Sequence, residues 1–316
     1  MASLPHRPLG SSGIEVSLFA LGSWRTFERI PHDQGLAVMR AAREAGITFL
    51  DDARYNDETG TAPIPTGYSE ILFGELFRDA GWVRDEVVVS NKLWWEFWPE
   101  QDAAAELDGS LGRMGLDHID LIYAMPPPEG LTVAQLVEQV AALISSGRAR
   151  SWGVGNWPAD QLIDAVQAAR GQGVPLPAAA QLPYSLVRSD WVQDPMMEGV
   201  LSDANIGLVA SYVLAGGTLT GKYLHGEAGR SQADQTAAAV SGKERASAVV
   251  ELAREWNVSP ASLAISFALS HPRLASVLFG ATSPEQLREN VASLEVFESL
   301  DDDQHRRLNA LASPTA

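Results

Sequence analysis

Short apolar runs rich in β-branched residues alternate along nearly the whole chain with longer segments whose apolar residues recur every three or four positions. The short runs predict buried β-strands, and the longer segments predict amphipathic helices. We expect eight strands, at residues 16–22, 47–52, 86–92, 119–125, 151–156, 178–184, 207–214 and 275–281. We expect helices at residues 33–46, 69–81, 102–115, 133–147, 159–173, 191–205, 243–257, 259–271 and 283–296.

Continuous apolar strands joined by helices indicate a parallel sheet covered by helices, and eight such units in 316 residues fit a closed (β/α)8 barrel of the α/β class. The competing arrangement, an open doubly wound sheet, usually carries a GxGxxG turn after its first strand. The segment LGSWRTFER at 21–29 does not match that turn. Residues 7–17 (RPLGSSGIEVS) predict a β-hairpin before the barrel. We therefore expect residues 1–316 to form one barrel domain with an N-terminal hairpin and extra C-terminal helices. The polar stretch 224–242 is expected to be a mobile loop.

Composition excludes several classes of function. The 40 acidic and 23 basic residues give a net charge of −17, which argues against nonspecific binding to nucleic acid or to anionic membranes. The chain has no cysteine, and its six histidines are scattered, so we expect neither thiol chemistry nor a metal site. No signal peptide and no run of about 18 apolar residues is evident. We expect a cytoplasmic protein that acts on a small molecule, and the oligomeric state, a homo-oligomer included, stays open.

Two adjacent acids, Asp51 and Asp52, follow an apolar pair in the segment FLDDARYNDETG at 49–60. Two like charges at a buried strand end cost free energy unless solvent, a cation or a reacting group receives them, although either residue alone could cap a turn. In a barrel the chemistry lies at the C-terminal ends of the strands. Lys92 ends the next strand, so we expect it to pair with Asp51 at the barrel mouth and to promote proton transfer to a nearby hydroxyl. The alternative for Lys92 is an ordinary surface lysine.

Several longer motifs extend this interpretation. They are RPLGSSGIEVSLFALGSW, AGITFLDDA, VVVSNK, GVGNW, AGGTLTGKY and VLFGATSPEQLREN. With these motifs the chain resembles the aldo-keto reductase family, barrels that reduce carbonyls with nicotinamide cofactors, collinearly from about residue 7 to residue 296. The last two motifs resemble the branch that includes the potassium-channel β-subunits. The resemblance implies an NADPH-dependent oxidoreductase.

The resemblance also implies where the cofactor lies. The cofactor contacts that it implies are Gly22, Ser23, Trp24 and Asp51 at the first strand ends, Asn156 and Gln181 on the carboxamide, Ser211 or Tyr212 on the nicotinamide ring, Leu214, Ala215, Gly216, Gly217 and Lys222 along the pyrophosphate, and Gly280, Thr282, Gln286, Glu289 and Asn290 at the adenosine end. Arg230 could add further positive charge. The segment GATSPEQLREN places backbone N–H groups and small hydroxyls at a helix N-terminus, which suits a 2′-phosphate and favours NADPH over NADH. The alternative for this segment is an ordinary capping box between Ser283 and Gln286.

The catalytic pattern departs from that of the family, which uses an Asp, a Tyr, a Lys and a His. Asp51 and Lys92 match, but the His position holds Met125, whose thioether cannot donate a hydrogen bond. The family spaces its Tyr five residues after the Asp, a position that holds Asn56 here, whereas Tyr55 comes one residue earlier. The usual Ser before Asn156 is Gly155, which is a further departure.

Three functions remain open at this point. In the first, Tyr55 donates a proton to a carbonyl or imine, and Asp51 and Lys92 lower the pKa of its hydroxyl. In the second, the pocket performs acid–base chemistry such as dehydration or isomerisation. In the third, the protein is a cofactor-binding sensor or accessory subunit with little turnover. For the pocket wall we expect aromatic residues and a hydrophobic substrate. The residues expected to line it are Trp24, Asn56, Tyr68, Trp94, Trp95, Trp98 and Met125.

Overall fold

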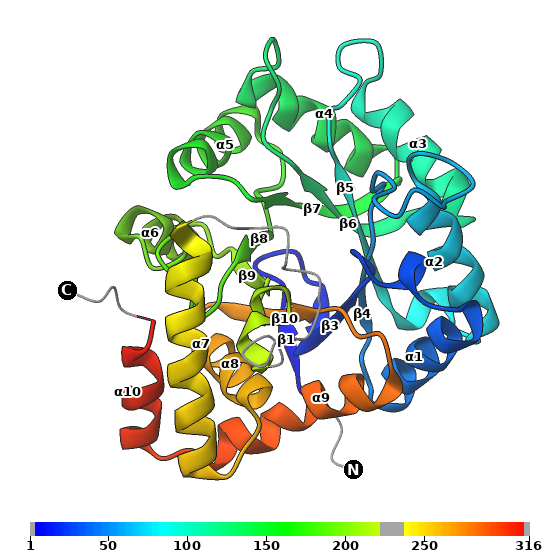
Figure 1. Cartoon of the computed structure of the whole chain (residues 1–316). Coiled ribbons are helices and arrows are strands. Elements are labelled where there is room, and N and C mark those ends of the chain that lie inside the picture. The colour runs from blue at the N-terminus through cyan, green and yellow to red at the C-terminus, as the bar shows by residue number, and fades with distance from the viewer. Residues whose placement is uncertain (1–3, 222–236, 313–316) are drawn as a thin grey trace.

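The computed structural model of the chain describes residues 4–221 and 237–312. Eight parallel strands close into a barrel in the order β10-β3-β4-β5-β6-β7-β8-β9, which confirms the (β/α)8 prediction (Figure 1). The strands are β3 (Phe19–Gly22), β4 (Phe49–Asp51), β5 (Val88–Leu93), β6 (Ile119–Ala124), β7 (Ala149–Gly155), β8 (Ala179–Pro183), β9 (Gly207–Ser211) and β10 (Leu274–Phe279). The helices between them are α1 (His32–Glu44), α2 (Tyr68–Asp79), α3 (Ala103–Met114), α4 (Val133–Ser145), α5 (Ala159–Gln172), α6 (Pro195–Asp203), α7 (Ala237–Trp256), α8 (Pro260–Leu269), α9 (Pro284–Ser299) and α10 (Asp302–Ala310).

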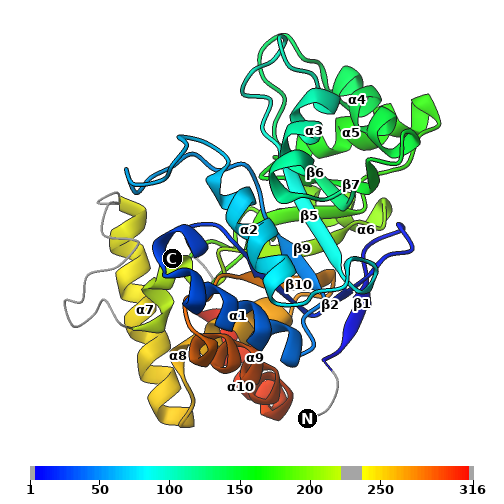
Figure 2. The ribbon, with the colours of Figure 1, turned by 90° about the vertical axis from the view of Figure 1, so that its right-hand side faces the viewer.

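A β-hairpin precedes the barrel, as expected, and consists of β1 (His6–Pro8) and β2 (Glu15–Ser17). In Figure 2 it lies on the side of the barrel away from α7. The expected first strand, 16–22, is therefore two elements. Residues 15–17 pair antiparallel with β1, whereas residues 19–22 pair parallel with β4 and β10. The change of partner falls within one continuous apolar run, so the hydrophobic pattern does not reveal it.

The hairpin sits directly against the start of the barrel strands. At Gly10 the backbone has a φ of +55°, and a Cβ there would lie 2.3 Å from the carbonyl oxygen of Ala178. Glycine is required at this position on both grounds, because it tolerates the left-handed conformation and carries no side chain.

Two apolar cores result from the alternation of side chains along the strands. The inner core fills the barrel and includes Phe49, Leu121 and Tyr123, whereas the outer core packs Leu50 and Ile122 against the helices. Along β4, Asp51 therefore faces the barrel interior, and Asp52, the next residue, faces the helical layer.

The C-terminal part differs from the expectation in two respects. Helix α7 begins at Ala237 rather than at residue 243, so the end of the expected loop 224–242 is helical, and residues 224–236 lie outside the described residues. Helix α10, within the extra C-terminal helices that were expected, begins with a capping box between Asp301 and Gln304. Within residues 4–221 and 237–312, no helix has the length and apolar character needed to cross a membrane.

Candidate active site

Asp51, Tyr55 and Lys92 meet at the mouth of the barrel. The Nζ atom of Lys92 donates to Oδ2 of Asp51 at 2.6 Å and to the hydroxyl oxygen of Tyr55 at 3.2 Å. Asp51 ends β4 and Lys92 lies in β5, and both side chains are almost completely buried. The surface alternative for Lys92 is therefore wrong.

Two further donors hold the carboxylate of Asp51. The hydroxyl of Ser90 donates to Oδ1 at 2.7 Å, and the amide Nε2 of Gln181 donates to the same atom at 3.1 Å. These bonds come from β5 and β8, on either side of the barrel interior. A buried carboxylate with three donors has a fixed orientation, so the position of Lys92 is also fixed.

Tyr55 reaches Lys92 although its loop is one residue shorter than the family spacing. The backbone at Tyr55 is anchored at both ends: its N–H donates to the carbonyl of Ala53 at 2.9 Å, and its carbonyl accepts from the N–H of Gly67 at 2.9 Å. The ring lies edge-on to Trp94, with centroids 6.0 Å apart. This loop geometry brings the phenol to the lysine and leaves Asn56, its neighbour, exposed.

The pKa of the Tyr55 hydroxyl is raised well above its usual value near 10, first by burial and then by the nearby carboxylate of Asp51. The resemblance implies that Asp51 and Lys92 lower the pKa of the Tyr55 hydroxyl. In the protein alone that pKa is raised instead. The phenol is fully protonated at neutral pH, which is the state that a proton donor requires.

Asp52 occupies the opposite face of the strand and is not part of the mouth. Its Oδ1 accepts a hydrogen bond from the hydroxyl of Ser23, and its Oδ2 has no hydrogen-bond partner among the described residues. Burial, with the negative charge of Glu70, raises the pKa of Asp52 well above its usual value. Glu70 itself has two partners, Arg113 at 2.5 Å and Asn91 at 2.9 Å. Among the described residues no cation forms an ion pair with Asp52, so its burial favours the protonated form of the carboxyl group.

Met125 fills the space beside Gly155. A Cβ built on Gly155 would lie 2.6 Å from the sulfur of Met125 and 3.9 Å from Cβ of Tyr123. The two departures from the family pattern at these positions are therefore sterically linked, since the thioether takes the volume that a side chain at position 155 would need. The indole of Trp95 donates to the carbonyl of Met125 at 3.1 Å and is 2% exposed. Trp95 is thus a buried support of this loop, which corrects its expected place in the pocket wall.

The other expected aromatic residues are more accessible than Trp95. Trp24, after β3, is 45% exposed, and Trp94 is partly buried beside Tyr55. Trp98 packs edge-on against Trp95, and Tyr68, which begins α2, is partly buried. The structure brings Trp24 and Trp94 to the mouth.

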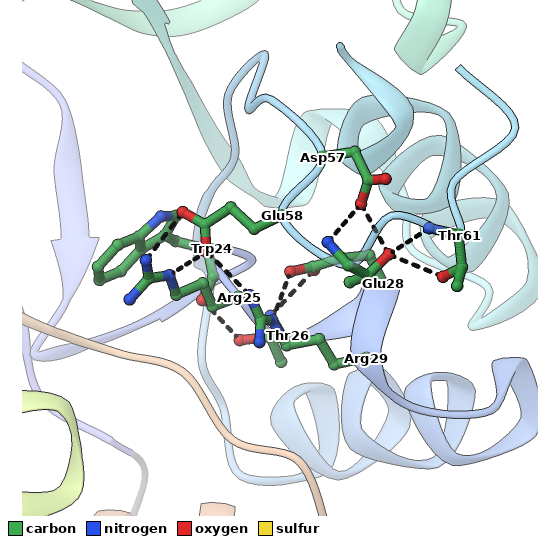
Figure 3. A network of polar contacts seen from close by, with 9 residues as sticks. Trp24, Arg25, Thr26, Glu28, Arg29, Asp57, Glu58 and Thr61 are labelled. Atoms are coloured by element: carbon green, nitrogen blue, oxygen red, sulfur yellow. Dashed lines mark hydrogen bonds and ion pairs between the residues drawn. The ribbon is translucent and has the colours of Figure 1, made fainter. Parts of the chain in front are cut away.

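A network of ion pairs ties the loop after β3 to the loop that carries Tyr55 (Figure 3). Glu58 accepts from Arg25 at 2.6 and 2.9 Å and from Arg29 at 2.9 Å. The guanidinium of Arg25 lies 4.6 Å from the ring centroid of Trp24, a cation–π contact. The sequence analysis missed this network, because complementary charges on separate loops carry no local pattern.

Several residues assigned to the cofactor, at strand ends and at the nicotinamide, border this mouth. Gly22 ends β3, and the N–H of Ser23 donates to the carbonyl of Asp51 at 3.0 Å. Asn156 follows β7 with a φ of 58°, and its N–H donates to the carbonyl of Gln181 at 3.0 Å. Ser211 ends β9 and is partly buried. These residues thus lie at strand ends, and backbone hydrogen bonds join Ser23 to Asp51 and Asn156 to Gln181.

A tight turn follows β9 at the residues assigned to the pyrophosphate. Tyr212, which is 37% exposed, has a φ of 56°, and Leu214 precedes a 3-10 helix, η3 (Ala215–Thr220). Inside η3, Gly216 and Gly217 have φ values of 65° and 95°. The N–H of Gly217 donates to the carbonyl of Leu214 at 2.9 Å, and neither glycine carries a Cβ, so a ligand can approach the main chain closely.

The residues assigned to the adenosine end lie in α9 and in the loop that precedes it. Ser283 caps the helix, and the side chain of Gln286 accepts from the N–H of Thr282 at 3.0 Å and from its hydroxyl at 2.9 Å. The expected capping box thus reaches back to Thr282, one residue before the cap. The remaining assigned residues are Gly280 (partly buried), Glu289 (exposed) and Asn290 (buried). Lys222 and Arg230, which were expected to add positive charge, lie outside the described residues.

Tyr123 is a residue of the site that the sequence analysis did not single out. It pairs with Lys92 in the register between β5 and β6, and the Nζ atom of Lys92 lies 6.0 Å from its ring centroid. Burial, followed by the charge of Asp51, raises its pKa well above the usual value. The alternation along 119–125 carried the signal, because Leu121 and Tyr123 share the inward face that leads to Lys92.

Comparisons with known proteins agree with this geometry. The family model described as "Aldo/keto reductase family" matches residues 19–313. A probable voltage-gated potassium channel subunit beta of Oryza sativa subsp. japonica is 31% identical over 320 residues, with 94% of this chain and 93% of the relative covered. A protein of the same description from Arabidopsis thaliana is 28% identical over the same shares of both chains. The L-glyceraldehyde 3-phosphate reductase of Escherichia coli (strain K12) is 31% identical over 311 residues, with 92% and 88% covered. The chain therefore belongs to the aldo/keto reductase family of oxidoreductases, whose members typically use NAD(P)H and act on small molecules.

Proposed function

We propose that the protein reduces the carbonyl or imine carbon of a hydrophobic small molecule with NADPH, and that Tyr55 donates the proton. The observation that carries this proposal is the chain of contacts from Asp51 through Lys92 to the hydroxyl of Tyr55, at 2.6 and 3.2 Å. It forms although the loop is short, so the usual spacing is not needed to place the phenol.

The residues around the mouth fit a dinucleotide. The glycine turn Gly216–Gly217 carries no side chains and so admits an anionic group close to the main chain, and the N-terminus of α9 carries the positive end of a helix dipole; both lie after barrel strands. The start of α9 favours a 2′-phosphate, hence NADPH. When bound, the cofactor supplies the hydride that adds to the electrophilic carbon.

The proton comes from this chain. Because its pKa is raised, Tyr55 keeps its proton until negative charge develops on the substrate heteroatom, and it then donates that proton. The ammonium of Lys92, hydrogen-bonded to the phenol oxygen, stabilises the phenolate that remains. Asp51 fixes the lysine in that position and is itself fixed by Ser90 and Gln181. Asp51 therefore acts as a positioning residue.

Met125 determines which substrates suit the site. Its thioether offers the substrate oxygen no second donor, and the loss of one such donor typically costs about 100- to 1,000-fold in rate. We therefore favour activated carbonyls or iminium ions, with apolar groups held by Trp24, Trp94 and the Met125 side chain.

An accessory role is the second candidate, because two of the relatives are described as potassium-channel β-subunits. In that role the chain would bind NADPH tightly and turn over little substrate. Acid–base chemistry at Asp51 and Lys92 without net reduction is the third candidate, as before.

The test follows the reduced-nicotinamide absorbance with a panel of aldehydes, ketones and imines, beside calorimetric binding of NADPH and NADH. We expect NADPH oxidation that is lost in Lys92→Met and in Tyr55→Phe but kept in Arg148→Gln, whose exposed ion pair joins the turn before β7 to Asp108 of α3. Full turnover in Tyr55→Phe would exclude Tyr55 as the donor. Tight NADPH binding with no turnover on the whole panel would favour the accessory role, and the absence of binding would overturn the reductase proposal.

A further inference from the structure

A second cavity lies at the opposite end of the barrel from Asp51. Its volume is about 420 Å³, and it is bordered by the hairpin strand β1, the start of β9 and the turn between α8 and β10. The polar residues that line it are Arg7, Asn205, Ser270, His271 and Arg273. A space of this size accommodates a small metabolite.

The charge of this cavity is opposite to that of the chain. Two guanidinium groups, those of Arg7 and Arg273, line it, and no carboxylate does. Within residues 4–221 and 237–312, neither arginine forms an ion pair with a carboxylate. In a protein with a net charge of −17, two neighbouring cations without a carboxylate are notable, because acidic partners are abundant elsewhere.

Each guanidinium is fixed at one end and has donors left at the other. Arg7 donates from one terminal nitrogen to the carbonyl of Leu274 at 2.8 Å, and Arg273 donates to Oδ1 of Asn205 at 2.7 Å and to the carbonyl of Ile206 at 3.3 Å. The Nε atom of Arg273 is buried and has no hydrogen-bond partner among the described residues. Two pre-positioned planar forks with unused N–H groups are the arrangement that binds phosphate or carboxylate.

His271 adds a neutral donor. Its Nδ1 accepts the backbone N–H of Arg273 at 3.2 Å, which places the ring proton on Nε2. Burial, and then the charge of Arg273, lowers the pKa of His271 to about 4, so the ring is neutral at physiological pH. Among the described residues that line the cavity, the two arginines are then the charged ones, which gives it a net charge near +2.

We propose that this cavity binds a small oxyanion, a free phosphate or the phosphate or carboxylate group of a metabolite. A purely structural role for the two arginines accounts for the bonds to Leu274 and Ile206 but leaves two cations at one cavity with no carboxylate among the residues that line it. A bound oxyanion neutralises both cations and accepts from their remaining N–H groups.

The test uses inorganic phosphate as the probe, with malonate as a dicarboxylate, at constant ionic strength set by chloride. The readouts are calorimetry, which sums over all sites, and the NMR signals of the His271 ring, which report on this cavity and not on the mouth. We expect phosphate to shift the His271 signals, and we expect Arg273→Gln and Arg7→Gln each to weaken binding at least about tenfold. Arg288→Gln, on the surface of α9, should change the affinity less than about twofold.

Two variants separate this site from the cofactor pocket and from a folding defect. Lys92→Met, altered at the other end of the barrel, should bind phosphate at this site as the wild type does, even where its turnover is lost. Arg273→Lys keeps the charge but not the planar fork, so it should fold and still bind phosphate more weakly. Binding of malonate alone would assign the site to carboxylates, and binding of phosphate to phosphate groups. Unmoved His271 signals with both anions, or equal affinity in Arg273→Gln, would overturn the proposal.

Discussion

The contact between Met125 and Gly155 predicts the effect of a single added methyl group. In Gly155→Ala the new Cβ would lie 2.6 Å from the sulfur of Met125, whereas non-bonded carbon and sulfur atoms prefer about 3.5–4.0 Å. Gly155 has no left-handed φ, so the cost is steric rather than conformational. Met125 is almost fully buried, so its thioether must shift within the packed site to admit the new Cβ.

Overpacking of this kind typically costs about 1–3 kcal/mol. At about 2.1 cal/mol/K per residue, the unfolding entropy of 316 residues converts that cost into a fall in Tm of roughly 2–5 °C. Met125→Ala alone should cost about 2–5 kcal/mol, because it leaves a cavity. In the double variant the two changes compensate, so we expect the pair to be more stable than the sum of the single effects by about 1–3 kcal/mol.

The assay is a thermal and urea unfolding cycle on the four proteins, with kcat and KM measured in parallel. A control cycle combines Gly155→Ala with Met39→Ala, a buried methionine in α1, and should be additive within about 0.5 kcal/mol. If the Met125 cycle is also additive, the thioether does not occupy the space beside Gly155, and our account of why these two positions depart together from the family pattern is wrong.

Three further predictions concern buried charge. Lys92→Met should lower stability by about 3–5 kcal/mol because it leaves Asp51 without its cation, and adding Asp51→Asn should recover most of that loss in urea unfolding while turnover stays absent. The raised pKa of Asp52 means that the folded state holds its proton more tightly than the unfolded chain does. Stability is therefore lost as the pH rises from about 4, the unfolded pKa, through the folded pKa. Asp52→Asn should remove that decline, and a pH profile of Tm that is unchanged in this variant would contradict the prediction. The pKa of His271 is about 4 in the folded state, so the free energy of unfolding should fall as the pH drops from about 6.5 to 4. His271→Gln should reduce this acid-side loss of stability by up to about 3 kcal/mol.

The fold was predictable because the signals that define it are periodic. Eight apolar runs at regular spacing determine a closed parallel sheet, and strand ends place polar residues such as Asp51 and Lys92 at one rim. The division of the run at residues 16–22 was not predictable, because pairing direction depends on the partner strands and not on the residues within the run.

The side-chain arrangement of the site was only partly accessible from the sequence. The spacing of Asp51 and Tyr55 left the reach of the phenol open, because loop path depends on distant anchors such as Gly67 and Ser69. The burial of Trp95 was likewise hidden, since a run of aromatic residues does not show which ring faces inward. Contacts between residues far apart in sequence, such as Arg25 with Glu58, require coordinates.

The two adjacent aspartates show how one strand end holds two acids that serve different purposes. Strand geometry sends Asp51 and Asp52 to opposite faces, so their carboxylates have different hydrogen-bond partners, although both charges act on Tyr55. On the inner face a cation and two neutral donors keep Asp51 as a hydrogen-bond acceptor for Lys92. On the outer face Glu70 pairs with Arg113, and burial raises the pKa of Asp52, which favours its protonated form. Replacement of Asp51 by Asn should therefore disturb Lys92 and turnover, whereas Asp52→Asn should alter only the pH dependence of stability, and a loss of turnover in Asp52→Asn would place the second acid within the reaction.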